Sequence, residues 1–144
     1  MAITNTIVNM AKRLFMNGGI DFDTDTIKVM LLNNSHTTNI DDDEYIDDVS
    51  SNEISGSGYT AGGATLSSKT VTVDDTNDLA YADAANVQWN SADFTAYYGV
   101  VYKDTGTPAT SPIICIIDFD GAKTVNPDGT FEIEWNASGI FKIS

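Results

Sequence analysis

The stretch PIICIIDFDGAKTVNPDGTFEIEW, residues 112–135, decides the fold class of this 144-residue chain. Its first part is a run of apolar residues, which is typical of a strand buried at the centre of a sheet. Its last part alternates between apolar residues, beginning at Phe131, and glutamates, as in a strand with one face in the core. The Asn-Pro-Asp-Gly sequence between them is a strong turn signal. We therefore predict a β-hairpin between residues 113–119 and 130–135.

Further strand patterns occupy most of the remaining chain. They are runs of β-branched and aromatic residues, separated by turn residues. These runs span residues 25–34, 64–75, 79–90, 93–104 and 139–144. No linker or repeat divides them, so we expect residues 1–144 to form a single mainly β domain. Strands at this spacing predict an antiparallel β-sandwich or barrel.

One short helix is expected ahead of the strands. Apolar residues recur at helical spacing over residues 5–17, and Gly18 and Gly19 are suited to end the helix in the left-handed conformation. The apolar stripe of such a helix covers either the sheet of its own chain or a neighbouring subunit. Residues 1–17 are accordingly a helix or an interaction arm, and residues 18–144 are the body of the domain.

The composition is acidic, with 21 aspartates and glutamates, 7 lysines and arginines, and a net charge of −14. Such a chain repels DNA, RNA and anionic membranes, so we expect no nucleic-acid partner and no membrane partner. No segment approaches the roughly 20 apolar residues that cross a bilayer. The two cations of the first 19 residues lie mid-segment, unlike those of a signal peptide. A soluble protein that folds without export is expected.

Four glycines lie close together in the stretch NEISGSGYTAGGATL, residues 52–66. They are Gly56, Gly58, Gly62 and Gly63. A phosphate-binding loop would need a lysine directly after its last glycine, and Ala64 stands there instead. The sequence after Gly63 has the pattern of a strand, whereas a phosphate-binding loop leads into a helix. We therefore interpret the cluster as a structural corner that packs around Tyr59.

Two acidic segments are candidate cation sites. Asp21, Asp23 and Asp25 alternate like the start of a calcium loop, but the later glycine and glutamate positions hold Thr26 and Leu32. A solvated turn is the preferred interpretation, and a weak metal site is the alternative. The second candidate set is Asp41, Asp42, Asp43 and Glu44, where the preferred interpretation of residues 41–48 is a mobile solvated loop. They lie in the polar stretch of residues 33–52, which we expect to be the least ordered part of the chain.

No catalytic constellation is evident. The single histidine, His36, lacks a local arrangement with a nucleophile and an acid. The single cysteine, Cys115, lies in the apolar run of residues 112–119 and is expected to be a buried, unreactive thiol. Most of the aromatic residues fall in or beside predicted strands, which predicts an aromatic core. We expect neither a catalytic residue nor a cofactor.

Several stretches share distinctive motifs. They are GGIDFDTDTIKVMLLNN (18–34), SGSGYTAGGATL (55–66), ANVQWNSADFTAYYGVVYKDTG (85–106) and PIICIIDFDG with NPDGTFEIEWNASGIFKI (112–143). The chain resembles, from about residue 18 to its end, a family of small virion proteins of tailed bacteriophages. Members share the Gly-Tyr-Thr-Ala-Gly-Gly turn, the Tyr-x-Asp-Thr-Gly strand end and the Gly-Thr-Phe-x-Ile-x-Trp strand.

The resemblance implies a structural role in the virion, with no catalytic residues. The first hypothesis is a decoration (cement) protein that binds the outer head surface, with the major capsid protein or other virion proteins as partners. It would be a homo-oligomer, with a trimer favoured, assembled in the host cytoplasm. The second is a tail, baseplate or fibre component. The third is a small carbohydrate-binding or hydrolytic domain, which would need an exposed Trp89 or Trp135 in a groove beside paired carboxylates.

Overall fold

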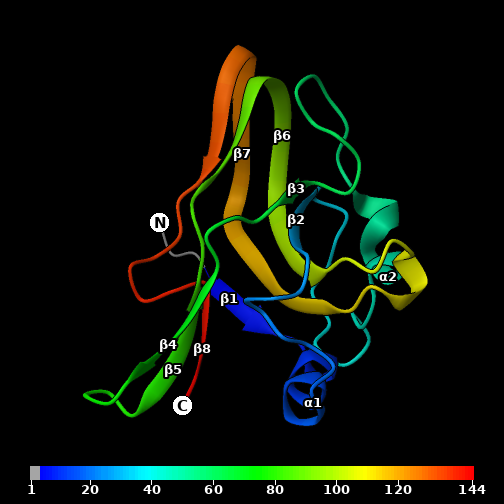
Figure 1. The fold of residues 1–144 in the computed structure, drawn as a ribbon. Coiled ribbons are helices and arrows are strands. Elements are labelled where there is room, and N and C mark those ends of the chain that lie inside the picture. Colours follow the sequence, from blue (N-terminus) through cyan, green and yellow to red (C-terminus); the bar gives the residue numbers. More distant parts are fainter. Residues whose placement is uncertain (1–3) are drawn as a thin grey trace.

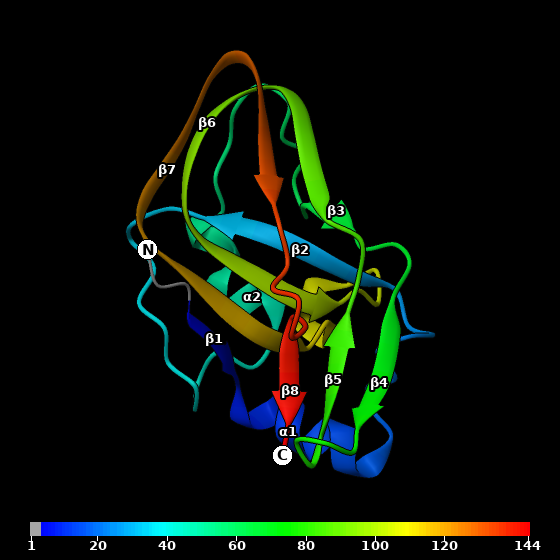
Figure 2. The ribbon, with the colours of Figure 1, turned by 90° about the vertical axis from the view of Figure 1, so that its left-hand side faces the viewer.

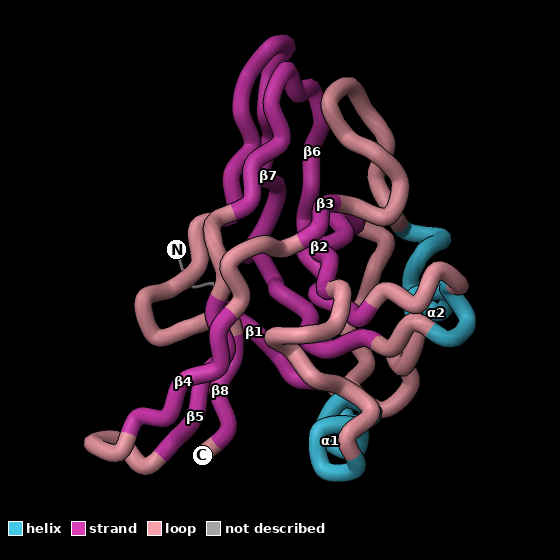
Figure 3. The backbone as a smooth tube through the Cα atoms, in the orientation of Figure 1, coloured by secondary structure: helices cyan, strands magenta, loops and turns pink. Residues whose placement is uncertain are grey.

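The computed structural model describes residues 4–144, which are mainly β, so the predicted fold class is confirmed (Figures 1 and 3). The strands are β1 (Thr4–Ile7), β2 (Ile27–Leu32), β3 (Ala64–Thr65), β4 (Thr70–Asp74), β5 (Leu79–Asp83), β6 (Val87–Lys103), β7 (Ile113–Ile133) and β8 (Phe141–Ile143). The helices are α1 (Asn9–Asn17), α2 (Ile46–Val49) and short 3-10 turns at Ser50–Asn52 and Pro108–Thr110. One antiparallel sheet has the order β1–β7–β6–β2–β3, and a second has the order β4–β5–β8.

Strands β6 and β7 form one long antiparallel ribbon that turns over the top of the molecule and descends again (Figure 2). Phe119 and Phe131 both lie on β7, and twelve positions of extended strand would separate them by about 40 Å. Their ring centroids are only 6.3 Å apart, because the strand reverses direction between them. The two halves of the ribbon therefore face each other as the layers of a β-sandwich.

Irregular pairing makes this reversal possible. Three register shifts interrupt the β6–β7 ladder between Trp89 and Tyr98. Ser91, Asp120 and Asp128, at the bend, have φ angles of 49°, 57° and 62°, in the left-handed region that regular strands avoid. Extra residues in one strand of a pair bend it and increase its twist, so these bulges act as the corner of the sandwich.

The predicted hairpin between residues 113–119 and 130–135 is wrong. Both segments belong to β7 and pair with β6, as in the pairs Ile117 with Gly99 and Phe131 with Trp89. The Asn-Pro-Asp-Gly sequence lies where two positions along β6 correspond to four along β7, so it forms a bulge instead of a chain reversal. Strand β6 is long enough to pair with both segments of β7. In a local hairpin the two segments would pair with each other and lose their pairing with β6.

The other strand predictions hold in part. The apolar run that begins β7 is central, between β1 and β6, and the runs at residues 25–34 and 139–144 contain β2 and β8 as expected. The run at residues 64–75 divides into β3 and β4. Residues 79–90 contain all of β5 and the start of β6, because the break falls at residues 84–86 and β6 continues without interruption to Lys103.

The prediction of a helix over residues 5–17 is wrong at its start. Residues Thr4–Ile7 form β1, which pairs with β7, and the helix begins only at Asn9. Its end is as predicted, since Gly18 is in the left-handed conformation with φ 79°. Ala11 is fully buried and the ring of Phe15 stacks on Phe141, so α1 packs on its own chain. Residues 1–3 of the proposed arm lie outside the described residues.

The polar stretch of residues 33–52 is more structured than expected. It contains α2 and a 3-10 turn, and the side chains of Ile46 and Val49 enter the hydrophobic core. The side chain of Asp48 accepts hydrogen bonds from the backbone N–H groups of Glu44 and Tyr45, which fixes the start of α2. Ile46 and Val49 are three positions apart in the sequence, and both pack into the core, so tertiary packing orders this segment where the local pattern does not.

Gly63 allows β3 to approach β2 closely. A Cβ atom at this position would lie 1.8 Å from the carbonyl oxygen of Val29, and the φ angle of Gly63 is 82°. Gly106 has a similar φ of 87°, but nothing lies within 4 Å of its Cβ position. The two glycines therefore share backbone strain and differ in steric crowding.

We expect Gly106→Ala to lower the free energy of unfolding by about 1–2 kcal/mol, the cost of a left-handed alanine. Gly63→Ala should lower it by about 2–5 kcal/mol, because the clash with the β2 backbone adds to that cost. Urea denaturation of both variants measures the difference. Equal losses in the two variants would show that β3 does not contact β2 as closely as described.

Candidate functional site

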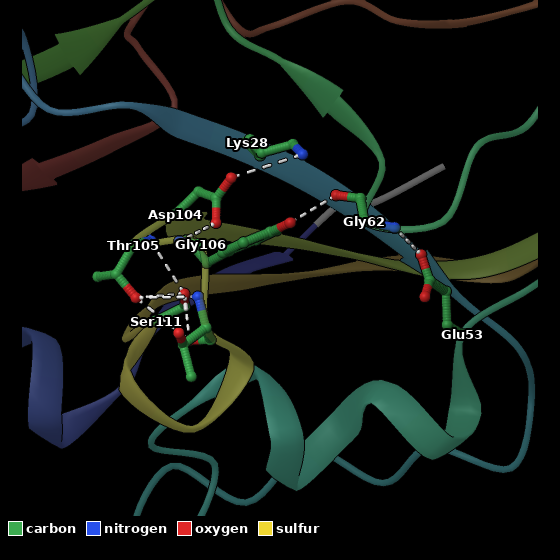
Figure 4. Close-up of polar contacts among 9 residues, drawn as sticks. Lys28, Glu53, Gly62, Asp104, Thr105, Gly106 and Ser111 are labelled. Carbon is green, nitrogen blue, oxygen red and sulfur yellow. Dashed lines mark hydrogen bonds and ion pairs between the residues drawn. The ribbon is translucent and has the colours of Figure 1, made fainter.

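A polar network holds the glycine-rich corner. Glu53 accepts hydrogen bonds from the Gly62 N–H at 2.6 Å and from the Tyr59 hydroxyl at 2.8 Å. The Tyr102 hydroxyl donates to the Gly62 carbonyl at 2.6 Å (Figure 4). A phosphate group would compete for the N–H that Glu53 holds, and the carboxylate would repel it. The segment forms a corner around Tyr59, as the sequence analysis predicts.

Tyr59 seals the edge of β2. Its hydroxyl oxygen accepts a hydrogen bond from the Leu31 N–H at 3.0 Å, and the Leu31 carbonyl accepts one from the Ile54 N–H at 3.1 Å. Its ring packs against Trp89 and Phe94, with centroids 6.2 and 5.8 Å away. Burial raises the pKa of Tyr59 far above its ordinary value, so the hydroxyl stays protonated and keeps donating to Glu53.

The turn between β6 and β7 is closed by hydroxyl groups (Figure 4). Ser111 is 1% exposed, and its hydroxyl donates to the Thr107 carbonyl at 2.8 Å and accepts from the Thr105 N–H at 3.0 Å. Asp104 forms an ion pair with Lys28 at 3.6 Å and accepts a hydrogen bond from the Gly106 N–H. Because its proton is used in the turn, Ser111 is a structural clamp and not an activated nucleophile.

His36 and Asp43 form a buried pair that the sequence does not reveal. The His36 side chain is 3% exposed, its Nε2 lies 3.7 Å from a carboxylate oxygen of Asp43, and its ring packs edge-on against Tyr98. Burial lowers the pKa of His36, and the nearby Asp43 carboxylate partly opposes this shift. Six residues, five of them polar, separate the two without a periodic signal, so only the folded loop shows their contact. The pair links two parts of the polar loop.

The aspartates proposed as a weak cation site make contacts within the protein. Asp25 forms an ion pair with Lys103 at 3.0 Å and accepts a hydrogen bond from the Asp21 N–H. Asp21 and Asp23 share a hydrogen bond, which lowers the pKa of Asp21 and raises that of Asp23. In residues 4–144, no group of three or more His, Cys, Asp or Glu side chains is placed to hold a metal. The weak site stays a prediction without a supporting geometry.

Cys115 lies in the core, as expected. It is fully buried in β7, and burial raises the pKa of its thiol to about 12. A thiol with this pKa carries almost no thiolate at neutral pH, and the thiolate is the reactive form. Cys115 is therefore a core side chain and not a nucleophile.

Both tryptophans are buried. Trp89 is 5% exposed and Trp135 is 9% exposed, and the Trp135 indole N–H donates to the Ala85 carbonyl at 3.0 Å. Neither ring is an exposed platform for stacking on a sugar. The exposed tryptophan that a carbohydrate-binding domain would need is therefore not found at either position.

An open groove of about 870 Å³ lies on the β7 side of the β-sandwich. Its floor is apolar and comes from both halves of the folded strand, as with Ile117 and Ile133. Charged residues at its rim include Glu132 and Glu134, and the Glu132 carboxylate accepts a hydrogen bond from the side chain of Gln88. The groove offers an apolar contact surface. The Glu132 carboxylate at its rim already binds Gln88 on the neighbouring strand β6.

Comparisons with family models, with curated proteins and with solved structures give no match for this chain. No helix in the part of the chain from residue 4 onward is long and apolar enough to cross a membrane.

Removing the Tyr59 hydroxyl should destabilise the corner. Tyr59→Phe leaves the Leu31 N–H without its acceptor and removes one of the two hydrogen bonds that the Glu53 carboxylate accepts, so we expect the free energy of unfolding to fall by about 1–3 kcal/mol. Tyr97→Phe is the matched control, because no hydrogen bond of the Tyr97 hydroxyl is found within residues 4–144, and it should cost less than about 0.5 kcal/mol. Chemical denaturation checks both values, and equal losses would contradict the sealing role.

His36 should make stability depend on pH. The unfolded chain protonates His36 near pH 6.5, whereas burial lowers the pKa in the folded protein. The folded state therefore binds fewer protons, and stability falls as pH drops below 6.5 toward the lowered pKa, by at most about 1.4 kcal/mol per pH unit. His36→Gln should remove this component of the slope. Urea denaturation between pH 7.5 and 5.5, at steps of about 0.5 unit, tests it, and an unchanged slope in the variant would refute the assignment.

Proposed function

We propose that this chain is a structural virion protein of a tailed bacteriophage, and specifically a decoration protein that binds the outer surface of the head. The proposal depends on one observation: the exposed apolar surface is concentrated on one small sheet. Of the five large apolar side chains that are exposed within residues 4–144, three belong to the projecting β4–β5–β8 sheet, namely Val71, Val73 and Ile143. The two candidate reactive side chains, His36 and Cys115, are buried. The molecule thus presents contact surface rather than a reactive centre.

The motif resemblance over residues 18–144 supports the choice of a virion protein, and the charge supports an outer position. A net charge of −14 would be repelled by packaged nucleic acid, which an outer head protein does not touch. Cement proteins act by adding interfaces between capsid subunits, and many copies act together. A homotrimer at local three-fold positions of the shell would match the symmetry of such sites.

A tail, baseplate or fibre component is the second candidate, because the same motif resemblance covers tail-associated proteins. The two candidates differ in location and copy number. A head decoration protein is present in hundreds of copies over the shell, and a tail component is present in a handful to dozens at one end. The carbohydrate-binding alternative has lost its main support, since Trp89 and Trp135 are both buried.

The proposal predicts that shells lacking this protein lose integrity at a lower temperature than decorated shells. Purified protein added back should bind assembled shells and not unassembled coat subunits, and it should restore the original melting temperature. Gel densitometry of purified virions should give hundreds of copies per particle. A few dozen copies, with antibody labelling at one end, would favour the tail component. Absence from purified virions would refute both candidates.

A further inference from the structure

The small β4–β5–β8 sheet has one face made only of apolar side chains. The pairing register aligns Val71 with Ala82, Val73 with Ala80, Ala82 with Phe141, and Ala80 with Ile143. Ala82 and Phe141 are covered at one end of this face, whereas Val71, Val73 and Ile143 are 53%, 70% and 52% exposed. We call these six residues the β4 face. Its outer half is an apolar surface on a sheet that projects below the folded ribbon (Figure 1).

A groove of about 320 Å³ lies directly against the β4 face. Its opposite wall comes from the end of α1 and the segment that follows, with Phe15, Ile20 and Phe22. Phe141 contributes to both walls, since it stacks on Phe15 and meets Phe22 edge-on, both at 5.4 Å between centroids. The groove therefore has a rigid aromatic end and opens toward the exposed valines.

The edge of β4 is open for pairing. Within residues 4–144, β4 pairs with β5 alone, so alternate backbone N–H and C=O groups along Thr70–Asp74 point away from the sheet. The edge of β2 is treated differently, because Tyr59 and Ile54 satisfy the backbone of Leu31. Inside β4 the sequence Thr-Val-Thr-Val has no charge, proline or bulge, which are the usual protections of an exposed edge.

The charges around the β4 face are mainly acidic. Asp21 lines the groove, and Asp75 and Asp78 are exposed in the turn that joins β4 to β5. The lysines of the neighbouring segments are engaged within the protein or lie on the other face. Lys69 donates to the Asp25 carbonyl, Lys103 donates to the Gly19 carbonyl and pairs with Asp25, and Lys142 pairs with Tyr81 on the opposite face of the sheet. A second copy of the chain would bring the same acidic rim against this one, so self-association through this particular face is disfavoured.

We propose that the β4 face is a docking site for an extended, basic segment of a partner protein, which adds as a strand to the free edge of β4. Alternate apolar side chains of this segment lie along Val71 and Val73 and enter the groove, and flanking lysines or arginines face Asp21, Asp75 and Asp78. Backbone hydrogen bonds supply affinity in such strand addition, and the side-chain pockets supply specificity. The inference rests on the geometry of the sheet and holds whether the protein belongs to the head, the tail or neither.

A designed peptide tests the site directly. The probe is an 11-residue peptide of alternating valine and threonine with two lysines at each end, titrated into the full-length protein and followed by amide chemical shifts. We expect shifts concentrated at Thr70–Asp74 and Ile143, and slower hydrogen exchange along β4. The same peptide with glutamates in place of the lysines should bind at least tenfold more weakly, and so should a version with a central proline.

Two pairs of variants separate the apolar and the charge contributions. Val71→Thr/Val73→Thr keeps β-branched side chains and should weaken binding at least fivefold, whereas Ile40→Thr, at an exposed apolar position away from the sheet, should not. Asp75→Asn/Asp78→Asn should weaken binding of the lysine peptide.

The control for this charge change is Asp120→Asn/Asp128→Asn, which alters two exposed aspartates at the ribbon corner. Asp78, Asp120 and Asp128 have similar positive φ angles of 55°, 57° and 62°, which asparagine tolerates.

Three results would overturn the proposal. One is the absence of shifts in β4 at millimolar lysine peptide. Another is equal binding of the glutamate peptide, which would remove the basic partner. The third is a dimer in sedimentation velocity that Val71→Thr/Val73→Thr dissociates, which would assign the β4 face to a second copy of the chain. None of these results bears on the heat resistance of decorated shells. The docking proposal can therefore fail while the proposed decoration function stands, and the reverse also holds.

Discussion

The structure depends on the folding of one two-stranded ribbon over itself. Strands β6 and β7 pair along most of their length, and their bend brings Phe119, Phe131, Trp89 and Phe94 into one cluster, with successive ring centroids 5.1–6.5 Å apart. Large aromatic side chains bury more area than any other type, so this contact between layers holds the sandwich closed. The remaining elements attach to the outside of the folded ribbon.

The two open sides of the sandwich are treated differently. On the β2 side, the glycine-rich corner brings Tyr59 against the aromatic cluster and satisfies the backbone of Leu31 through its hydroxyl. On the β7 side, β1 covers only the lower part of the strand, with pairs from Asp118 to Cys115, and an apolar groove remains above it. The small sheet then adds an uncovered edge at β4. Contact surface is therefore concentrated on the β7 side and on the small sheet.

This distribution connects the fold to the proposed role. Ser111, Cys115 and His36 are buried inside the protein, with Ser111 hydrogen-bonded in its turn and His36 against Asp43. A rigid body with projecting apolar surface and a strong negative charge suits a protein that adheres to an assembly. A free strand edge would give such a body a specific attachment, because a partner segment has to match both the backbone spacing and the alternate side chains.

The sequence by itself determined the mainly β class, the central position of the Cys115 strand, the left-handed end of the helix at Gly18 and the structural role of the glycine cluster. Each of these follows from local chemistry, such as apolar runs, glycine conformation or the missing lysine at Ala64. The tertiary structure alone decided how the strands join. Asn-Pro-Asp-Gly has the chemistry of a turn, yet Asp128 lies in a bulge because β6 offers a longer partner than a local hairpin does.

The same reason explains the other differences. The start of the predicted helix became β1 because the edge of β7 at Cys115–Asp118 accepts a strand there, and the acidic loop became ordered because Ile46 and Val49 reach the core. The contact of His36 with Asp43 and the exposure of the β4 face were equally invisible in the sequence. Local pattern fixes what each residue prefers, whereas pairing partners and burial depend on residues far away in the chain, and only the folded structure brings those together.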